Sequence, residues 1–187
     1  TELNIDARGN MFGKMAKASV ADNGPMDGNE WIVDIIASTG NTRDELNSVG
    51  VRHIAKDGYD RLDEFEPPTV PGNITLRIDN RDRKISPDIY AKDIRKPNEH
   101  GHYWDLQVYT PTNGQRTYIT FEGLGYVPQE YDIFIINKTN QQAKNLKWES
   151  TYRFANTGSE GYLKQDLRLV IGTKQFVEEN NAGVNLY

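Results

Sequence analysis

The 187-residue sequence contains no cysteine. A disulfide framework, a thiolate zinc site and a cysteine nucleophile are therefore excluded. It also lacks any apolar run approaching the roughly 20 residues of a membrane-spanning helix, so we expect no membrane insertion. The opening residues, TELNIDARGN, lack the basic start and apolar core of a secretion signal. If the chain is exported, we expect that a signal has been removed and that the chain is a piece of a longer protein.

Clustered positive charge is missing as well. The 22 Lys and Arg residues are scattered among 27 Asp and Glu residues, which gives a net charge of −5. No basic stripe is present that would neutralise a phosphate backbone. Nucleic acid is therefore not an expected partner.

Helical periodicity is almost absent, whereas alternation of apolar and polar residues recurs. The alternation predicts strands, which cover residues 31–38, 74–79, 104–109, 116–122, 131–136, 144–147, 151–155 and 163–171. The PTNG stretch at 111–114 predicts a hairpin between two of these strands, and NKTN at 137–140 predicts another turn. Only RDELNS at 43–48, between Gly40 and Gly50, predicts one or two helical turns.

These patterns predict an all-β fold with minimal helix, in the form of an antiparallel β-sandwich of the jelly-roll or immunoglobulin-like kind. We expect one domain over residues 1–176. Within it, residues 64–72 contain three prolines and predict a stiff, extended crossover. Residues 177–187 are polar and predict a C-terminal linker.

Several landmarks follow one another in a distinctive order. They are Trp31, Asp44, Asn47, Gly50, AKDGYDRLDEFEPP at 55–68, Gly72, DIR at 93–95, GHYWDLQV at 101–108, FEGLGYVPQEY at 121–131, Asn145–Leu146 and LRLVIG at 167–172. This order resembles a non-catalytic β-sandwich region of long surface and secreted bacterial proteins exported by the type IX secretion system. There the region lies upstream of a C-terminal sorting domain. The resemblance covers roughly residues 30–172 and implies an extracellular or cell-surface accessory module without established catalytic residues.

The stretch at 55–72, AKDGYDRLDEFEPPTVPG, is rich in acidic residues. Calcium binds six to eight oxygens from carboxylates and carbonyls, so this loop is a candidate calcium site. The candidate ligands are Asp57, Asp60, Asp63 and Glu64. In the alternative, which the spacing favours, the acids cap backbone amides or pair with Arg52 and Arg61.

The apolar residues of the same stretch recur at intervals of three. Tyr59, Leu62 and Phe65 are therefore predicted to pack inward, while the aspartates face water or one calcium ion. In this hypothesis the stretch has a mainly structural role.

Two further loops offer weaker candidates. ADNGPMDGNEW at 21–31 holds Asp22, Asn23, Asp27, Asn29 and Glu30, but its Asn-Gly and Asp-Gly pairs are first of all turn formers. NEHGHYW at 98–104 places Glu99, His100 and His102 close together, as zinc or copper would require. Exposed loop histidines are the favoured interpretation there.

No arrangement of residues indicates catalysis. No pair of carboxylates stands in a signature that selects a general acid and its partner. No G-x-S-x-G elbow or comparable nucleophile context occurs. We therefore expect a protein that is not an enzyme.

Aromatic residues are the remaining candidates, with three Trp, ten Tyr and six Phe. Trp31 and Trp104 each begin an apolar alternation and are predicted to lie in the core. Candidate surface rings for a sugar ligand are Trp148, Tyr152, Tyr109, Tyr126 and Tyr103, with Trp148 the leading one because its neighbours are polar.

Two functional hypotheses follow from these residues. The first is an accessory module that binds polysaccharide through surface aromatics. The second is a structural or adhesive module that packs against neighbouring domains of a larger protein and has no glycan ligand. Exposed, roughly coplanar rings in a groove would favour the first, and an apolar patch without such rings would favour the second.

Overall fold

The computed structural model describes residues 28–56, 58–84, 86–111, 115–155 and 163–186. Within them lie β1 (Trp31–Thr39), β2 (Thr42–Val51), β3 (Glu64–Phe65), β4 (Thr75–Asp79), β5 (Ile89–Arg95), β6 (Gly101–Thr110), β7 (Arg116–Glu122), β8 (Asp132–Asn137), β9 (Gln142–Asn145), β10 (Thr151–Ala155) and β11 (Leu163–Gly172). The helical elements are two 3-10 turns, η1 (Arg81–Arg83) and η2 (Leu124–Tyr126), and α1 (Lys174–Glu179). The prediction of an all-β fold is confirmed. Among these residues, no helix is long and apolar enough to span a bilayer.

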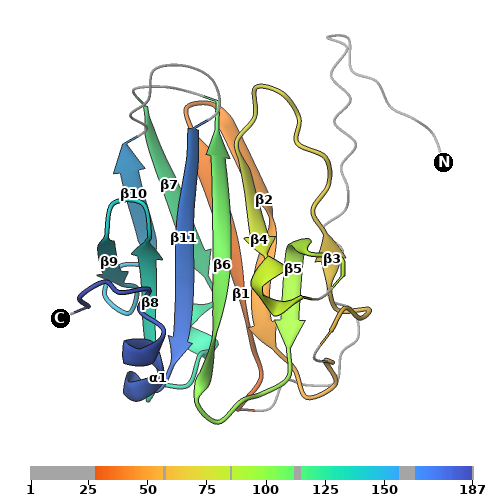
Figure 1. Ribbon diagram of the computed structural model, residues 1–187, viewed down its shortest axis with the longest axis vertical. Coiled ribbons are helices and arrows are strands. Elements are labelled where there is room, and N and C mark those ends of the chain that lie inside the picture. The colour runs from red at the N-terminus through yellow and green to blue at the C-terminus, as the bar shows by residue number, and fades with distance from the viewer. Residues whose placement is uncertain (1–27, 57, 85, 112–114, 156–162, 187) are drawn as a thin grey trace.

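The strands form one hydrogen-bonded sheet in the order β10-β7-β1-β2-β5-β4-β6-β11-β8-β9, with β3 beside β5. The β2–β5 pair is parallel and the other pairs are antiparallel. The sheet curls until its edge strands approach each other and is nearly closed (Figure 1). Lys144 of β9 bridges the remaining gap, because its Nζ donates to the Thr151 carbonyl of β10 at 2.9 Å. One continuous sheet therefore replaces the two separate sheets of the expected sandwich, and neither the jelly-roll nor the immunoglobulin-like type is confirmed.

The inner faces of the strands enclose one large apolar cluster that draws on both halves of the sheet. Trp31 of β1 and Trp104 of β6 are both buried in it, as predicted. Their rings meet edge to face, with centroids 5.9 Å apart and an interplanar angle of 78°. This geometry is favoured for aromatic pairs, and it joins strands that lie far apart in the sheet order.

The sheet has a second interruption between the first half of β2 and the start of β4, because β5 separates only the later parts of these two strands. Side chains of β2 replace the backbone ladder there. Thr42 Oγ1 accepts the N–H of Ile74 at 3.2 Å, and Asp44 Oδ2 accepts the N–H of Leu76 at 2.8 Å. We call this place the β2–β4 seam.

The helical turns expected at 43–48 are wrong, because these residues belong to β2. Strands β1 and β2 form a hairpin in which Thr39 lies opposite Thr42. The two residues between them are Gly40 and Asn41, and Gly40 has a φ of 54°. A Gly-Asn pair between two strands is a hairpin signal, so sequence reasoning could have found this turn.

The hairpin expected across 111–114 is also wrong. β6 pairs with β4 and β11, whereas β7 pairs with β1 and β10. The chain thus crosses between the two halves of the sheet, and residues 112–114 lie outside the described residues. Turn residues indicate that the chain reverses, but they do not fix which strand it pairs with. The turn expected at 137–140 does join a paired hairpin, β8 and β9.

The acidic stretch crosses the outer face of the sheet and contributes only the two-residue strand β3. Leu62 is buried against Ala55 and Ile94, as predicted. The inward packing expected of Tyr59 and Phe65 is wrong, since they are 42% and 52% exposed. Their rings stack on each other instead, with centroids 4.6 Å apart. The irregular backbone provides no common face for residues spaced by three.

The linker expected at 177–187 is part of the folded domain as far as residue 186. Thr173 caps α1, because its Oγ1 accepts the N–H of Phe176 at 3.3 Å. Val177 and Val184 are buried against Phe134 of β8 and Val170 of β11. The composition is polar, but Val177 and Val184, with Phe176, Ala182 and Leu186 packed beside them, cover the outer face of these strands.

Leu62 and Phe65 of the acidic stretch should respond differently to truncation. Leu62→Ala should lower the free energy of unfolding by about 2–5 kcal/mol, because it opens a cavity in a buried cluster. Phe65→Ala should cost only about 0.5–1.5 kcal/mol, the value of an aromatic pair at the surface. Denaturant unfolding of both variants checks this, and equal losses would contradict the described packing.

Candidate ligand-binding site

Two hollows lie at the end of the sheet where β1, β6, β8 and β10 begin. The Trp148 pocket has a volume of about 550 Å³, and its lining includes Leu124, Val127, Pro128, Leu146, Lys147 and Trp148. The Trp31 pocket has a volume of about 380 Å³, and its lining includes Trp31, Val51, Asn98, Pro128, Glu130 and Tyr131. Pro128 belongs to both and stands between them.

Trp148 lies in the turn between β9 and β10 and is 87% exposed. The turn is anchored just before it. Leu146 is buried and donates its N–H to the Ile133 carbonyl at 2.8 Å, while Lys147 N–H donates to Asn145 Oδ1 at 2.9 Å. Lys147 Nζ also donates to the Gln129 carbonyl across the pocket at 2.8 Å. An ordered turn therefore presents a large apolar ring to solvent.

Tyr126 lies in the chain between Gly125 and Val127, which line the same pocket, but it is not itself among the described lining residues. It is 70% exposed and ends η2, whose residues Leu124 and Gly125 line the pocket. η2 is closed by hydrogen bonds from Tyr126 N–H to the Gly123 carbonyl and from Val127 N–H to the Leu124 carbonyl. Of the five aromatic candidates, Trp148 and Tyr126 are the two that lie on elements bordering this pocket.

The other three candidates lie elsewhere. Tyr152 is 5% exposed and belongs to the core, so its expected surface position is wrong. It lies opposite Ile119 of β7 and shares that residue's inward face. Tyr103 and Tyr109 do point outward from β6, but a guanidinium group covers one face of each ring.

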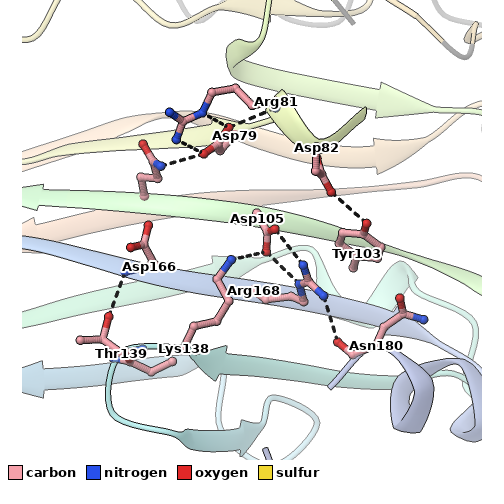
Figure 2. Close-up of polar contacts among 12 residues, drawn as sticks. Asp79, Arg81, Asp82, Tyr103, Asp105, Lys138, Thr139, Asp166, Arg168 and Asn180 are labelled. Atoms are coloured by element: carbon pink, nitrogen blue, oxygen red, sulfur yellow. Dashed lines mark hydrogen bonds and ion pairs between the residues drawn. The ribbon is translucent and has the colours of Figure 1, made fainter. Parts of the chain in front are cut away.

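The guanidinium group over Tyr103, that of Arg168, belongs to a charged network on the outer face. Arg168 lies 4.1 Å from the Tyr103 ring centroid, and Arg77 lies 4.7 Å from that of Tyr109. Figure 2 shows Arg168 donating twice to Asp105, with Lys138 on the same carboxylate. Burial favours a higher pKa for Asp105, but these cations outweigh it and hold the pKa below its usual value. The charges of this face are matched to one another, so it offers little to a ligand.

The calcium candidates mostly serve the backbone. Asp60 accepts the N–H groups of Lys56 and Leu62, both at 2.7 Å. Asp63 is buried rather than facing water, and it accepts the N–H groups of Asp60 and Ile94, both at 2.9 Å. Burial raises the pKa of Asp63 to about 6.

Of the other two calcium candidates, only Glu64 is among the described residues. Glu64 pairs with Lys92, and Asp57 lies outside the described residues. Over the described ranges, no group of three or more His, Cys, Asp or Glu residues is placed to hold a metal ion. Asp60 and Asp63 therefore cap backbone amides, as the alternative predicts, and calcium binding stays a prediction.

The described residues of the two weaker loop candidates lie in different environments. Asp22, Asn23 and Asp27 lie outside the described residues, whereas Glu30 is buried and accepts the N–H of His53 at 2.7 Å. Glu99 and His100 are exposed on the turn before β6. His102 lies on the inward face of β6 beside Trp104, with ring centroids 5.6 Å apart.

Sequence reasoning missed a polar cluster at the β2–β4 seam. Burial, with a further contribution from Asp44, raises the pKa of Glu66 to about 8, and burial also raises the pKa of Asp44. Asn47 of β2 is fully buried beside them, and within the described part of the chain neither of its polar side-chain atoms has a hydrogen-bond partner. No local signal marks these residues, because they meet only beyond the start of β5, where it no longer separates β2 from β4.

Comparison with known proteins gave no match: no family model, no curated protein and no solved structure is similar to this chain.

Glu66→Gln should stabilise the protein in a pH-dependent way. Between pH 4.5 and 8 the folded state keeps a proton on Glu66 that the unfolded chain releases, so wild-type stability falls as the pH rises through this range. The glutamine variant avoids this loss. We expect it to exceed wild type by about 1–2 kcal/mol at pH 8.5, after allowance for partial exposure of Glu66, and by much less at pH 5.

Thermal unfolding at both pH values measures the difference. Glu45→Gln is the matched control, because it removes one exposed carboxylate from the neighbouring strand. A gain for Glu66→Gln that does not change with pH would contradict the raised pKa.

Proposed function

We propose that this chain is a non-catalytic module that binds polysaccharide at the Trp148 pocket. The observation that carries the proposal is an indole ring that is 87% exposed on an anchored turn, at the rim of a hollow of about 550 Å³. Tryptophan is enriched at interfaces, and aromatic side chains commonly line ligand pockets.

The chemistry around the ring suits a neutral sugar. A flat indole covers the apolar face of a pyranose, while nearby amide, hydroxyl and charged groups can bond its hydroxyls. Gln129, Lys147 and Ser150 supply such groups in the lining. Lys147 is already shared between the Gln129 carbonyl and Asp132, so the pocket does not offer an unbalanced positive charge to an anion.

The resemblance to regions of type IX secretion cargo supports a wider proposal. In it, the chain acts outside a bacterial cell or at its surface and keeps a larger protein at its substrate. Calcium bound by the acidic stretch would be a structural addition, and no residue would act as a catalyst.

An alternative function rests on the same ring. Tryptophan is enriched at the energetic centres of protein interfaces, so Trp148 could instead anchor a neighbouring domain of a larger protein. In that case the chain is a structural or adhesive module. It then has no glycan ligand of its own.

Replacing Trp148 separates these functions. Trp148→Ala should lower retention on the polysaccharide bound by wild type by at least about tenfold, because the stacking surface is lost. The melting temperature should stay the same, since the ring is exposed. Affinity electrophoresis or pull-down on a panel of soluble and insoluble polysaccharides, with and without a chelator, measures retention.

Two control variants frame this result. Tyr118→Ala removes a partly exposed ring of β7 outside both pockets and should retain wild-type binding. Trp104→Ala should destabilise the fold by about 3–5 kcal/mol, because it empties a core position. If wild type binds no polysaccharide on the panel, or if Trp148→Ala binds as well as wild type, the glycan proposal is rejected.

A further inference from the structure

The Trp31 pocket differs in chemistry from the Trp148 pocket across Pro128. Its floor is apolar and buried, since Trp31 and Val51 belong to the core cluster. Its rim is polar and includes Glu99 and Glu130, which are both exposed. A volume of about 380 Å³ lies within the range of small-ligand sites, which is roughly 300–1,000 Å³.

The walls of the pocket are fixed to each other. The Tyr131 hydroxyl, at the start of β8, donates to the Asn98 carbonyl at 3.1 Å. Asn98 in turn accepts the N–H of His100 through its side-chain oxygen at 2.9 Å. The turn before β6 is thereby tied to the segment that separates the two pockets, so the hollow is formed before any ligand arrives.

The charge of the lining is one-sided. It contains two carboxylates, and no Lys or Arg is among its described lining residues. Both carboxylates act on the Tyr131 hydroxyl, whose pKa is raised first by burial and then by Glu130 and Glu99. The nearby Arg95 is engaged elsewhere, with Asp93 at 2.7 Å and Asn80 at 3.0 Å.

His102 also belongs to this lining and is uncharged. Its Nε2 lies 2.8 Å from the Lys96 carbonyl, and a carbonyl can only accept, so Nε2 carries the proton. Burial and the charge of Arg95 lower the pKa of His102 to about 4, which keeps the ring neutral at pH 7. In the neutral ring, Nδ1 is then the acceptor.

We propose that the Trp31 pocket binds a small ligand through a protonated primary amino group. Such a group carries one positive charge and three N–H donors. The pocket offers two carboxylates as acceptors, its lining includes the neutral His102 ring, and aromatic rings attract cations at short range. The apolar floor would receive the alkyl or ring part of the ligand. This site does not depend on the proposed glycan site, because the two share only Pro128.

The three tryptophans of the chain report on the two sites separately. Trp31 lines one pocket, Trp148 lines the other, and Trp104 is enclosed in the core. In a two-dimensional ¹H–¹⁵N spectrum at pH 7, titration with n-butylammonium should shift the Trp31 indole signal saturably and leave the Trp148 signal in place. The neutral n-butanol should produce less than about one tenth of this shift at equal concentration.

Charge-neutral variants test the recognition itself. Glu99→Gln and Glu130→Gln should each weaken n-butylammonium binding by about five- to tenfold, because each removes one charge-assisted contact. Both side chains are exposed, so the variants should fold. Glu45→Gln changes the net charge equally but lies far along β2 from the pocket, and it should bind within about twofold of wild type.

Three results would overturn the proposal. They are the absence of a saturable Trp31 shift, equal shifts with n-butanol, and an equal loss of affinity in Glu45→Gln. Tetramethylammonium, which has no N–H donor, should bind at least about fivefold more weakly, and equal affinity would overturn the assignment to a primary amino group. Loss of glycan binding at Trp148 would leave all these outcomes unchanged.

Discussion

The fold has to enclose one apolar core with a sheet whose ring of backbone hydrogen bonds is incomplete. The ladder is missing in two places, between β9 and β10 and along the upper part of β2 and β4. At the first, Lys144 donates across the gap to a carbonyl of the opposite edge. At the second, Thr42 and Asp44 accept the N–H groups that a neighbouring strand would have taken. The second bridge has unfavourable groups beside it. The amide of Asn47 is buried with no hydrogen-bond partner among the described residues, and the pKa of Glu66 is raised. The Trp31–Trp104 contact holds the two halves together where the bridges do not reach.

The same closure explains why the pockets lie at an end of the sheet. Strand ends cannot cover the core by themselves, so the inward side chains at this end are covered by turns alone. The segment from η2 to Tyr131 divides the remaining space in two, with Pro128 as the partition. The Trp148 pocket is lined by an indole on an anchored turn and by a lysine that is already hydrogen-bonded. The Trp31 pocket is lined by two carboxylates and a neutral imidazole. Two pockets with different lining groups therefore lie next to each other, and both are formed by loops that cover this end of the core.

Much of this could be predicted from the sequence, and the limits have physical causes. Alternation identified most strands, and the polar neighbours of Trp148 distinguished it from the two core tryptophans. β2 was missed because RDELNS has a helix-like composition, although the preceding Gly-Asn pair marks a hairpin. The partners of β6 and β7 depend on packing between distant strands, which turn residues do not encode. The seam cluster and the Trp31 pocket are assembled from segments far apart in the chain, so no local pattern announces them.

The acidic residues of the 55–72 stretch follow the same rule as the bridges. A segment that crosses the outer face without regular strands leaves N–H groups that need acceptors, and unpaired buried N–H groups are costly. Asp60 and Asp63 accept three of them, from Lys56, Asp60 and Leu62, and Asp63 also accepts the N–H of Ile94 in β5, which ties the crossover to the sheet. The acidic residues of this stretch therefore serve to order its backbone. Glu99 and Glu130, by contrast, are exposed and line the Trp31 pocket, outside this crossover. This difference in local task, rather than the number of acids, separates a structural cluster from a candidate site.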